Sequence, residues 1–117
     1  MTPAETLKLR LRSDLTMALR RRERVEISTL RALIGAVDTA EAVPPGDRHA
    51  RYVTYSFGDP ATEIPRRSLT SAELQALLSR EDEDRTNAAK VLDDLGHADR
   101  AADLLAQARI IRRYGSD

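Results

Sequence analysis

The sequence has 117 residues and no net charge, with 41% apolar and 32% charged residues. This length suits one domain with a modest core, and the absence of cysteine excludes disulfides, thiolate metal sites and cysteine nucleophiles. No apolar run approaches the roughly 20 residues that span a membrane, and no secretory leader precedes the first predicted helix, so the expected location is the cytoplasm.

Two amphipathic helices are predicted in the first half of the chain, near residues 3–21 and 23–42. Thr2 is the expected N-cap of the first helix, with Glu5 as its capping-box partner. The apolar stripe of this helix is formed by Leu7, Leu11, Leu15, Ala18 and Leu19. The second helix carries the i, i+3, i+4, i+7 spacing of a buried face at Leu30, Leu33, Ile34 and Val37.

Residues 43–69 show no helical period and contain four of the five prolines. We expect a long irregular loop that lies against the helices. Residues 51–57 (RYVTYSF) alternate weakly and form either a short strand or an extended arm. They hold three of the four aromatic residues, Tyr52, Tyr55 and Phe57, which would cover an apolar patch. A loop of this length in a small domain is typical of functional or mobile segments.

Two further helices are predicted near residues 71–95 and 98–114. Thr70 and Glu73 form a second capping box, and Leu69 with Leu74 can close a hydrophobic staple. Gly96 suits a C-terminal cap, and the short connection predicts an antiparallel hairpin. The stripes of these two helices include Leu77, Leu78, Ala88, Val91, Leu92, Leu95, Ala101, Leu104, Leu105, Ala108 and Ile111. The predicted fold is therefore all-α, a single small bundle of about four helices over residues 1–117.

The sequence offers no recognisable catalytic, metal or cofactor motif. His49 and His97 lack the spacing that zinc sites use, so we expect both to be exposed to solvent. The five glycines match neither a P-loop nor a dinucleotide-binding fingerprint. The acidic run 81–84 lacks the central glycine and closing glutamate of a calcium loop and is interpreted as a solvated helix face.

A cluster of arginines is the strongest indication of function in the sequence. Residues 1–31 hold eight basic and four acidic side chains, and four of the basic ones fall within residues 20–24. Arg20, Arg24 and Arg31 could form a row of fork-shaped phosphate donors. The structural alternative is a solvated helix junction, with Glu23 and Glu26 paired to neighbouring arginines and the cations at the end of the first helix offsetting its dipole. The candidate nucleic-acid-binding residues are Arg20, Arg21, Arg22, Arg24 and Arg31.

Two stretches, 24–42 (RVEISTLRALIGAVDTAEA) and 66–114, resemble the YqeY-like family, in its N-terminal helical part. The matched features are Arg24 with Leu30-Arg31, Glu41-Ala42, Leu69-Thr70 with Glu73, Arg80-Glu81, Arg85 and Gly96. The family's helical domain is similar to the tail domain of the GatB subunit of aspartyl/glutamyl-tRNA amidotransferase. The resemblance implies a helical fold and an association with tRNA-dependent amidation, without an active site in this part.

Three functions remain open from the sequence. The first is a noncatalytic GatB/YqeY-like module that binds tRNA or another RNA through the arginine cluster, with an affinity that falls steeply with salt. The second is a protein-interaction module that uses residues 43–65 or an incompletely buried helix stripe. The third and most distant is a carbon–nitrogen ligase with glutamine as amido-N-donor. No cofactor, metal or membrane partner is expected.

Overall fold

A computed structural model describes residues 1–42 and 67–115. This part of the chain forms four helices: α1 (Pro3–Arg21), α2 (Arg24–Ala42), α3 (Ser71–Asp94) and α4 (Ala98–Gly115). The predicted all-α class is confirmed, with helix bounds that match the sequence prediction to within a residue. Residues 67–70 lead into α3 without helical structure, and the rest of the predicted loop, with His49, Tyr52, Tyr55 and Phe57, lies outside the described residues.

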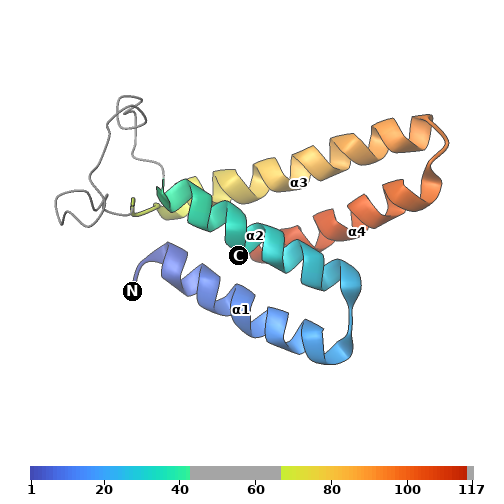
Figure 1. The fold of residues 1–117 in the computed structure, drawn as a ribbon. Helices are drawn as coiled ribbons and strands as arrows, with labels where there is room; N and C mark the ends of the chain where they lie inside the picture. Colours follow the sequence, from blue (N-terminus) through green and yellow to red (C-terminus); the bar gives the residue numbers. More distant parts are fainter. Residues whose placement is uncertain (43–66, 116–117) are drawn as a thin grey trace, which may run out of the picture.

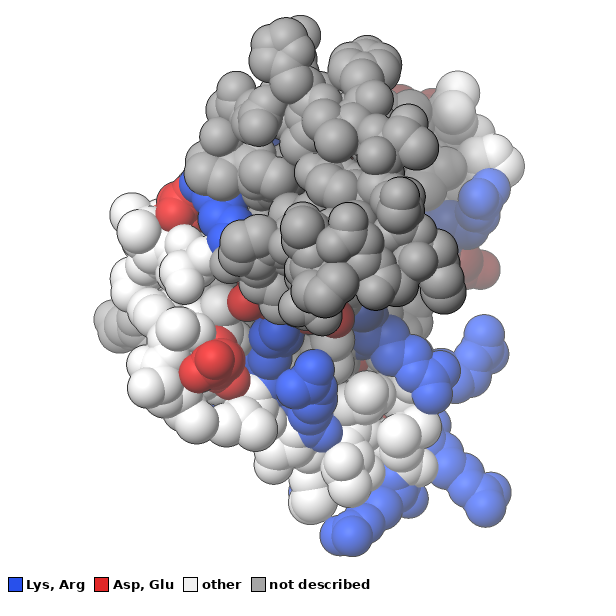
Figure 2. All heavy atoms as spheres, turned by 60° about the vertical axis from the view of Figure 1, so that its left-hand side comes forward, with Lys and Arg blue, Asp and Glu red and all other residues white. Residues whose placement is uncertain are grey.

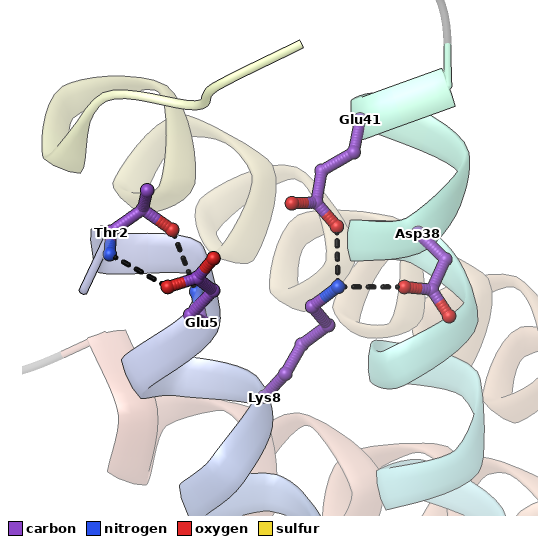
Figure 3. Close-up of polar contacts among 5 residues, drawn as sticks. All are labelled: Thr2, Glu5, Lys8, Asp38 and Glu41. Carbon is purple, nitrogen blue, oxygen red and sulfur yellow. Dashed lines mark hydrogen bonds and ion pairs between the residues drawn. The ribbon is translucent and has the colours of Figure 1, made fainter. Parts of the chain in front are cut away.

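Both predicted capping boxes are formed. At the start of α1, the Glu5 N–H donates to the Thr2 hydroxyl and the Thr2 N–H donates to the Glu5 carboxylate, both at 3.1 Å (Figure 3). The same pair of bonds, at 3.0 and 3.1 Å, joins Thr70 and Glu73 at the start of α3. Each box satisfies two backbone N–H groups that have no partner within the helix. Local sequence therefore fixes where these helices begin.

The helices form two hairpins, α1 with α2 and α3 with α4, that meet at one end and diverge at the other (Figure 1). Where they meet, Ala4, Val37, Leu69 and Leu74 form one buried cluster. A larger cluster joins all four helices and includes Leu11, Leu30, Leu33, Leu78, Ile111 and Tyr114. The two helix–helix turns lie at the diverging end, away from the start of α1 and the start of α3.

Five residues of the predicted apolar stripes are exposed, which corrects the sequence prediction: Leu19, Ala88, Val91, Leu95 and Leu105. The exposed fraction is 45% for Leu19, 58% for Val91, 67% for Leu95 and 39% for Leu105. Leu19, Val91 and Leu95 lie within four residues of a helix–helix turn, at the diverging end of their hairpins, whereas Leu105 lies near the middle of α4. Helical periodicity identifies the inner face of a helix but does not show how far along that face the neighbouring helix extends.

A buried ion pair closes the other end of the α1–α2 hairpin. The Lys8 ammonium donates to Glu41 at 2.6 Å and to Asp38 at 3.0 Å, and Lys8 and Glu41 are 8% and 7% exposed (Figure 3). The hydrogen bond to Glu41 raises the pKa of Lys8, against the opposing effect of burial. Because Lys8 and Glu41 are 33 residues apart, their pairing depends on the α1–α2 packing.

Candidate nucleic-acid interface

The five candidate arginines lie on the α1–α2 hairpin and are all exposed. Arg20 and Arg21 belong to the last turn of α1, Arg22 lies in the turn, Arg24 begins α2, and Arg31 lies two turns further along α2. The turn therefore brings the end of α1, the connection and the start of α2, each with at least one of these arginines, onto one short stretch of surface. Arg10 and Arg12 of α1 are also exposed, and Figure 2 shows Lys and Arg side chains projecting from the lower part of the molecule, at the height of α1 in Figure 1.

Arg22 has the left-handed backbone conformation that ends α1, with φ 55° and ψ 40°. Its N–H donates to the Leu19 carbonyl at 3.3 Å, and the Glu23 N–H donates to the Ala18 carbonyl at 3.1 Å. The same pair of bonds ends α3, at 3.0 and 2.8 Å, with Gly96 at φ 84° in the equivalent position. For a side chain with a Cβ, this conformation costs about 1 kcal/mol. The backbone conformation that ends α1 would therefore favour glycine at residue 22.

Four of the five candidate arginines lie at helix ends, where their effect on the helices differs. Arg20 and Arg21 lie at the C-terminus of α1, where cations offset the helix dipole. Arg24 is the first residue of α2, where the dipole repels a cation. The stability of the fold accounts for the first two arginines. It does not account for Arg22 and Arg24, so these two are stronger indicators of a functional surface.

Two acidic side chains of the α1–α2 hairpin are held by α4, whereas Glu23 is exposed and forms no ion pair with a described residue, contrary to its expected pairing. Arg113 donates to the Glu26 carboxylate at 2.8 Å, and the Tyr114 hydroxyl donates to Asp14. The expected pairing of Glu26 with a nearby arginine of α2 is therefore wrong, because α4 brings in a closer cation. Within residues 1–42 and 67–115, none of the five candidate arginines forms an ion pair.

Arg24 and Arg31 share a groove between α2 and α4, with a volume of about 560 Å³. Asp103 and Gln107 of α4 form its other wall, and Gln107 accepts a hydrogen bond of 3.0 Å from Arg85. An adjoining hollow of about 440 Å³ is lined by Arg24, Leu92, Asp99, Arg100, Asp103 and Leu104. Of the five candidates, only Arg24 and Arg31 line either hollow. The sequence could not identify the α4 wall because helix packing alone brings it to α2.

The buried hydroxyl of Tyr114 anchors the C-terminal end of α4 against α1. Burial and the hydrogen bond to Asp14 raise the pKa of Tyr114. The Arg10 guanidinium lies 4.6 Å from the centre of the Tyr114 ring and donates to the Arg113 carbonyl at 3.3 Å. These contacts fix Arg113 and Tyr114 beside the acidic groups of α1 and α2.

The acidic run of α3 is only partly a solvated face. Glu83 and Asp84 are exposed, but Glu81 lies 3.5 Å from Arg85 and Asp82 accepts a 2.9 Å bond from Arg112. The hydrogen bond from Arg112 lowers the pKa of Asp82. His97, in the α3–α4 turn, is exposed as predicted. No group of three metal-ligating side chains occurs among the described residues.

None of the four described helices is both long and apolar enough to cross a membrane. Comparison with protein-family models gives no match, and neither the curated proteins nor the solved structures contain a match. The likeness to the YqeY-like family thus stays an expectation from the sequence.

Proposed function

We propose that this chain is a noncatalytic helical module that binds the phosphate backbone of tRNA or a related RNA. The proposed contacts are Arg20, Arg21, Arg22, Arg24 and Arg31. The observation that carries the proposal is that all five are exposed and none is neutralised by an ion pair within the described residues, whereas Glu26 is paired with Arg113 of α4.

Arginine suits this role because its planar guanidinium forms two parallel hydrogen bonds with one phosphate. Arg22 and Arg24 support the proposal further, since each occupies a position where the fold would be more stable with another residue. The only aromatic side chain among the described residues, Tyr114, is buried. Base stacking is therefore not offered by this surface, and recognition of backbone and shape is the expected mode.

The resemblance to the YqeY-like family favours tRNA among RNA ligands, and a supporting role in tRNA-dependent amidation. On this proposal the chain holds the nucleic acid, and amide transfer takes place on another protein.

The test is fluorescence anisotropy of labelled unfractionated tRNA titrated with the purified chain. For three to five phosphate contacts to single-stranded regions, affinity should fall on the order of 10- to 100-fold between about 50 and about 200 mM salt. The triple variant Arg20→Glu, Arg21→Glu and Arg24→Glu should lose binding at both salt concentrations.

A matched control reverses three exposed cations elsewhere, Arg80, Lys90 and Arg109, and changes the net charge equally. This control should retain most of the affinity if the α1–α2 turn is the interface. Equal losses in both triple variants would indicate a nonspecific charge effect, and absence of binding at low salt would overturn the proposal.

A protein-interaction module is the second candidate, favoured by the exposed Val91 and Leu95. These residues belong to the partly uncovered helix stripe that the sequence left open as a docking surface. The candidate predicts binding that survives salt and is lost when these apolar side chains are replaced. Residues 43–65, the other predicted docking element, lie outside the described part of the chain.

A further inference from the structure

The turn between α3 and α4 is acidic. Residues 93–99 (DDLGHAD) contain three aspartates and no lysine or arginine, which gives a net charge of −3 with His97 neutral. Asp93, Asp94 and Asp99 are exposed, and none of them forms an ion pair with a described residue. The turn therefore presents a negative surface at Asp93 and Asp94, while Asp99 shares its hollow with Arg24 and Arg100.

The turn between α1 and α2 has the opposite charge. Residues 19–24 (LRRRER) contain four arginines and one glutamate, which gives a net charge of +3. Both turns lie at the diverging end of the molecule (Figure 1). The chain thus carries two surfaces of equal and opposite charge on neighbouring projections.

Each charged turn also bears exposed apolar side chains. Leu95 is 67% exposed and Val91 is 58% exposed beside the acidic turn, whereas Leu19 is 45% exposed and Met17 is 42% exposed beside the basic turn. Charge alone seldom holds two proteins together, because exposed ion pairs contribute little in water. Apolar contact between the same two turns would supply the additional attraction.

This arrangement has the symmetry that a two-fold dimer requires. A two-fold axis placed beyond the two turns, perpendicular to the plane that contains both hairpins, brings the acidic turn of one chain opposite the basic turn of another. The same operation forms the contact twice, since in a two-fold interface each surface meets its complement on both sides. The two hairpins of one chain diverge, so their turns are available to a second chain.

We propose that this chain forms a two-fold homodimer in which the acidic α3–α4 turn of each copy packs against the basic α1–α2 turn of the other. The partner is a second copy because the chain itself supplies both complementary charges and both apolar edges. The inference goes beyond the proposed function and does not depend on it, because the dimer forms without RNA. It does use Arg20 and Arg21, so RNA and the second copy would compete for one surface.

The test is sedimentation equilibrium of the full chain without RNA, over about 1 to 200 µM protein. We expect a monomer–dimer equilibrium that weakens by about tenfold or more between about 50 and about 500 mM salt, because the charges at its edge are screened. A chain that stays monomeric over this range at low salt would overturn the proposal.

Two charge-reversed variants make the test specific. One carries Arg20→Glu and Arg21→Glu, and the other carries Asp93→Arg and Asp94→Arg. Each variant alone should be monomeric, because both of its turns have the same sign. An equimolar mixture should restore the dimer, since both contacts are then between opposite charges. Circular dichroism of each variant establishes that the helices remain folded.

The matched control for the mixture replaces the second variant with Glu83→Arg and Asp84→Arg, which reverses two exposed acids within α3. Its net charge equals that of the turn variant, so general attraction between oppositely charged proteins would act equally. The control variant keeps both native turns and dimerises by itself, so the comparison follows a labelled Arg20→Glu, Arg21→Glu chain. Association of this labelled chain with the control as strong as with the turn variant would contradict the proposal. So would a turn mixture that stays monomeric.

The absence of cysteine in the sequence allows a direct measurement of the contact. Single cysteines introduced as Arg21→Cys in one sample and Asp94→Cys in another should form a mixed disulfide on oxidation of their mixture. Glu83→Cys in place of Asp94→Cys should not cross-link efficiently. Equal cross-linking of both pairs would indicate random collision and not the proposed dimer.

Discussion

Arg113, in the last turn of α4, donates a 2.8 Å hydrogen bond to Glu26, in the first turn of α2. The contact joins residues that are 87 positions apart. The Glu26 side chain is 16% exposed and the Arg113 side chain is 52% exposed. The pair links the two hairpins and holds an acidic group beside the arginine cluster.

Replacing Arg113 with alanine should lower the free energy of unfolding by about 1 kcal/mol, since a partly exposed pair contributes modestly and Glu26 loses its cation. Urea unfolding followed by circular dichroism measures this change. The control is Arg109→Ala, on the same helix, where Arg109 is exposed and forms no ion pair with a described residue. Equal effects of the two substitutions would show that the Glu26 contact does not contribute to stability.

Replacing Arg22 with glycine should raise the free energy of unfolding by about 0.5–1 kcal/mol, because glycine adopts the left-handed conformation without a Cβ penalty. The melting temperature should rise by a few degrees. The opposite change, Gly96→Ala, forces a Cβ into φ 84° and should destabilise the chain by about 1 kcal/mol.

The Arg22→Gly variant also separates stability from RNA binding. If Arg22 contacts phosphate, the more stable variant should bind tRNA less tightly, with a salt dependence reduced by roughly one contact. Unchanged affinity and unchanged salt dependence would remove Arg22 from the interface.

Replacing Lys8 with methionine should destabilise the chain by about 3 kcal/mol, because the buried Glu41 carboxylate loses a principal cation. The double variant Lys8→Met and Glu41→Leu should recover much of this loss, since the buried charges are replaced by apolar groups of similar volume. Thermal melting compares the three chains. A double variant as unstable as the single one would mean that packing, and not charge, explains the loss.

Stability should fall at alkaline pH for two reasons. The pKa of Tyr114 is raised above its ordinary value of 10.0 by burial and by the hydrogen bond to Asp14, so the unfolded chain loses this proton first. The pKa of Lys8 is raised above 10.5 by its bond to Glu41. Each group contributes its full stabilisation below the pKa it has in the unfolded chain. This stabilisation declines as the pH rises toward the pKa that the group has in the folded chain.

Urea unfolding at about pH 8, 9.5 and 11 tests this linkage in the full chain and in Tyr114→Phe. The Tyr114→Phe variant should be less stable than the full chain by about 1 kcal/mol at pH 8, through loss of a hydrogen bond. The difference between the two should shrink at pH 11. A difference that is constant with pH would show that Tyr114 does not titrate differently in the folded state.

Sequence reasoning located the helices because their signals are local. The capping boxes at Thr2 and Thr70, and Gly96 with its left-handed turn, involve residues no more than five positions apart. The five candidate arginines were also found from their spacing alone. Periodicity does not explain the exposure of Arg21 and Arg22, which follow the buried Ala18 by three and four residues and are exposed where α1 ends.

The sequence by itself thus determined the four helices, their inner faces and the arginine cluster. Only the tertiary structure decided that the hairpins diverge, that Leu19 and Leu95 are exposed, and that Arg113 and Tyr114 hold Glu26 and Asp14. The physical reason is distance along the chain. Capping and periodicity act within a few residues, whereas burial of a stripe and pairing of a charge depend on helices that only the packed fold brings together.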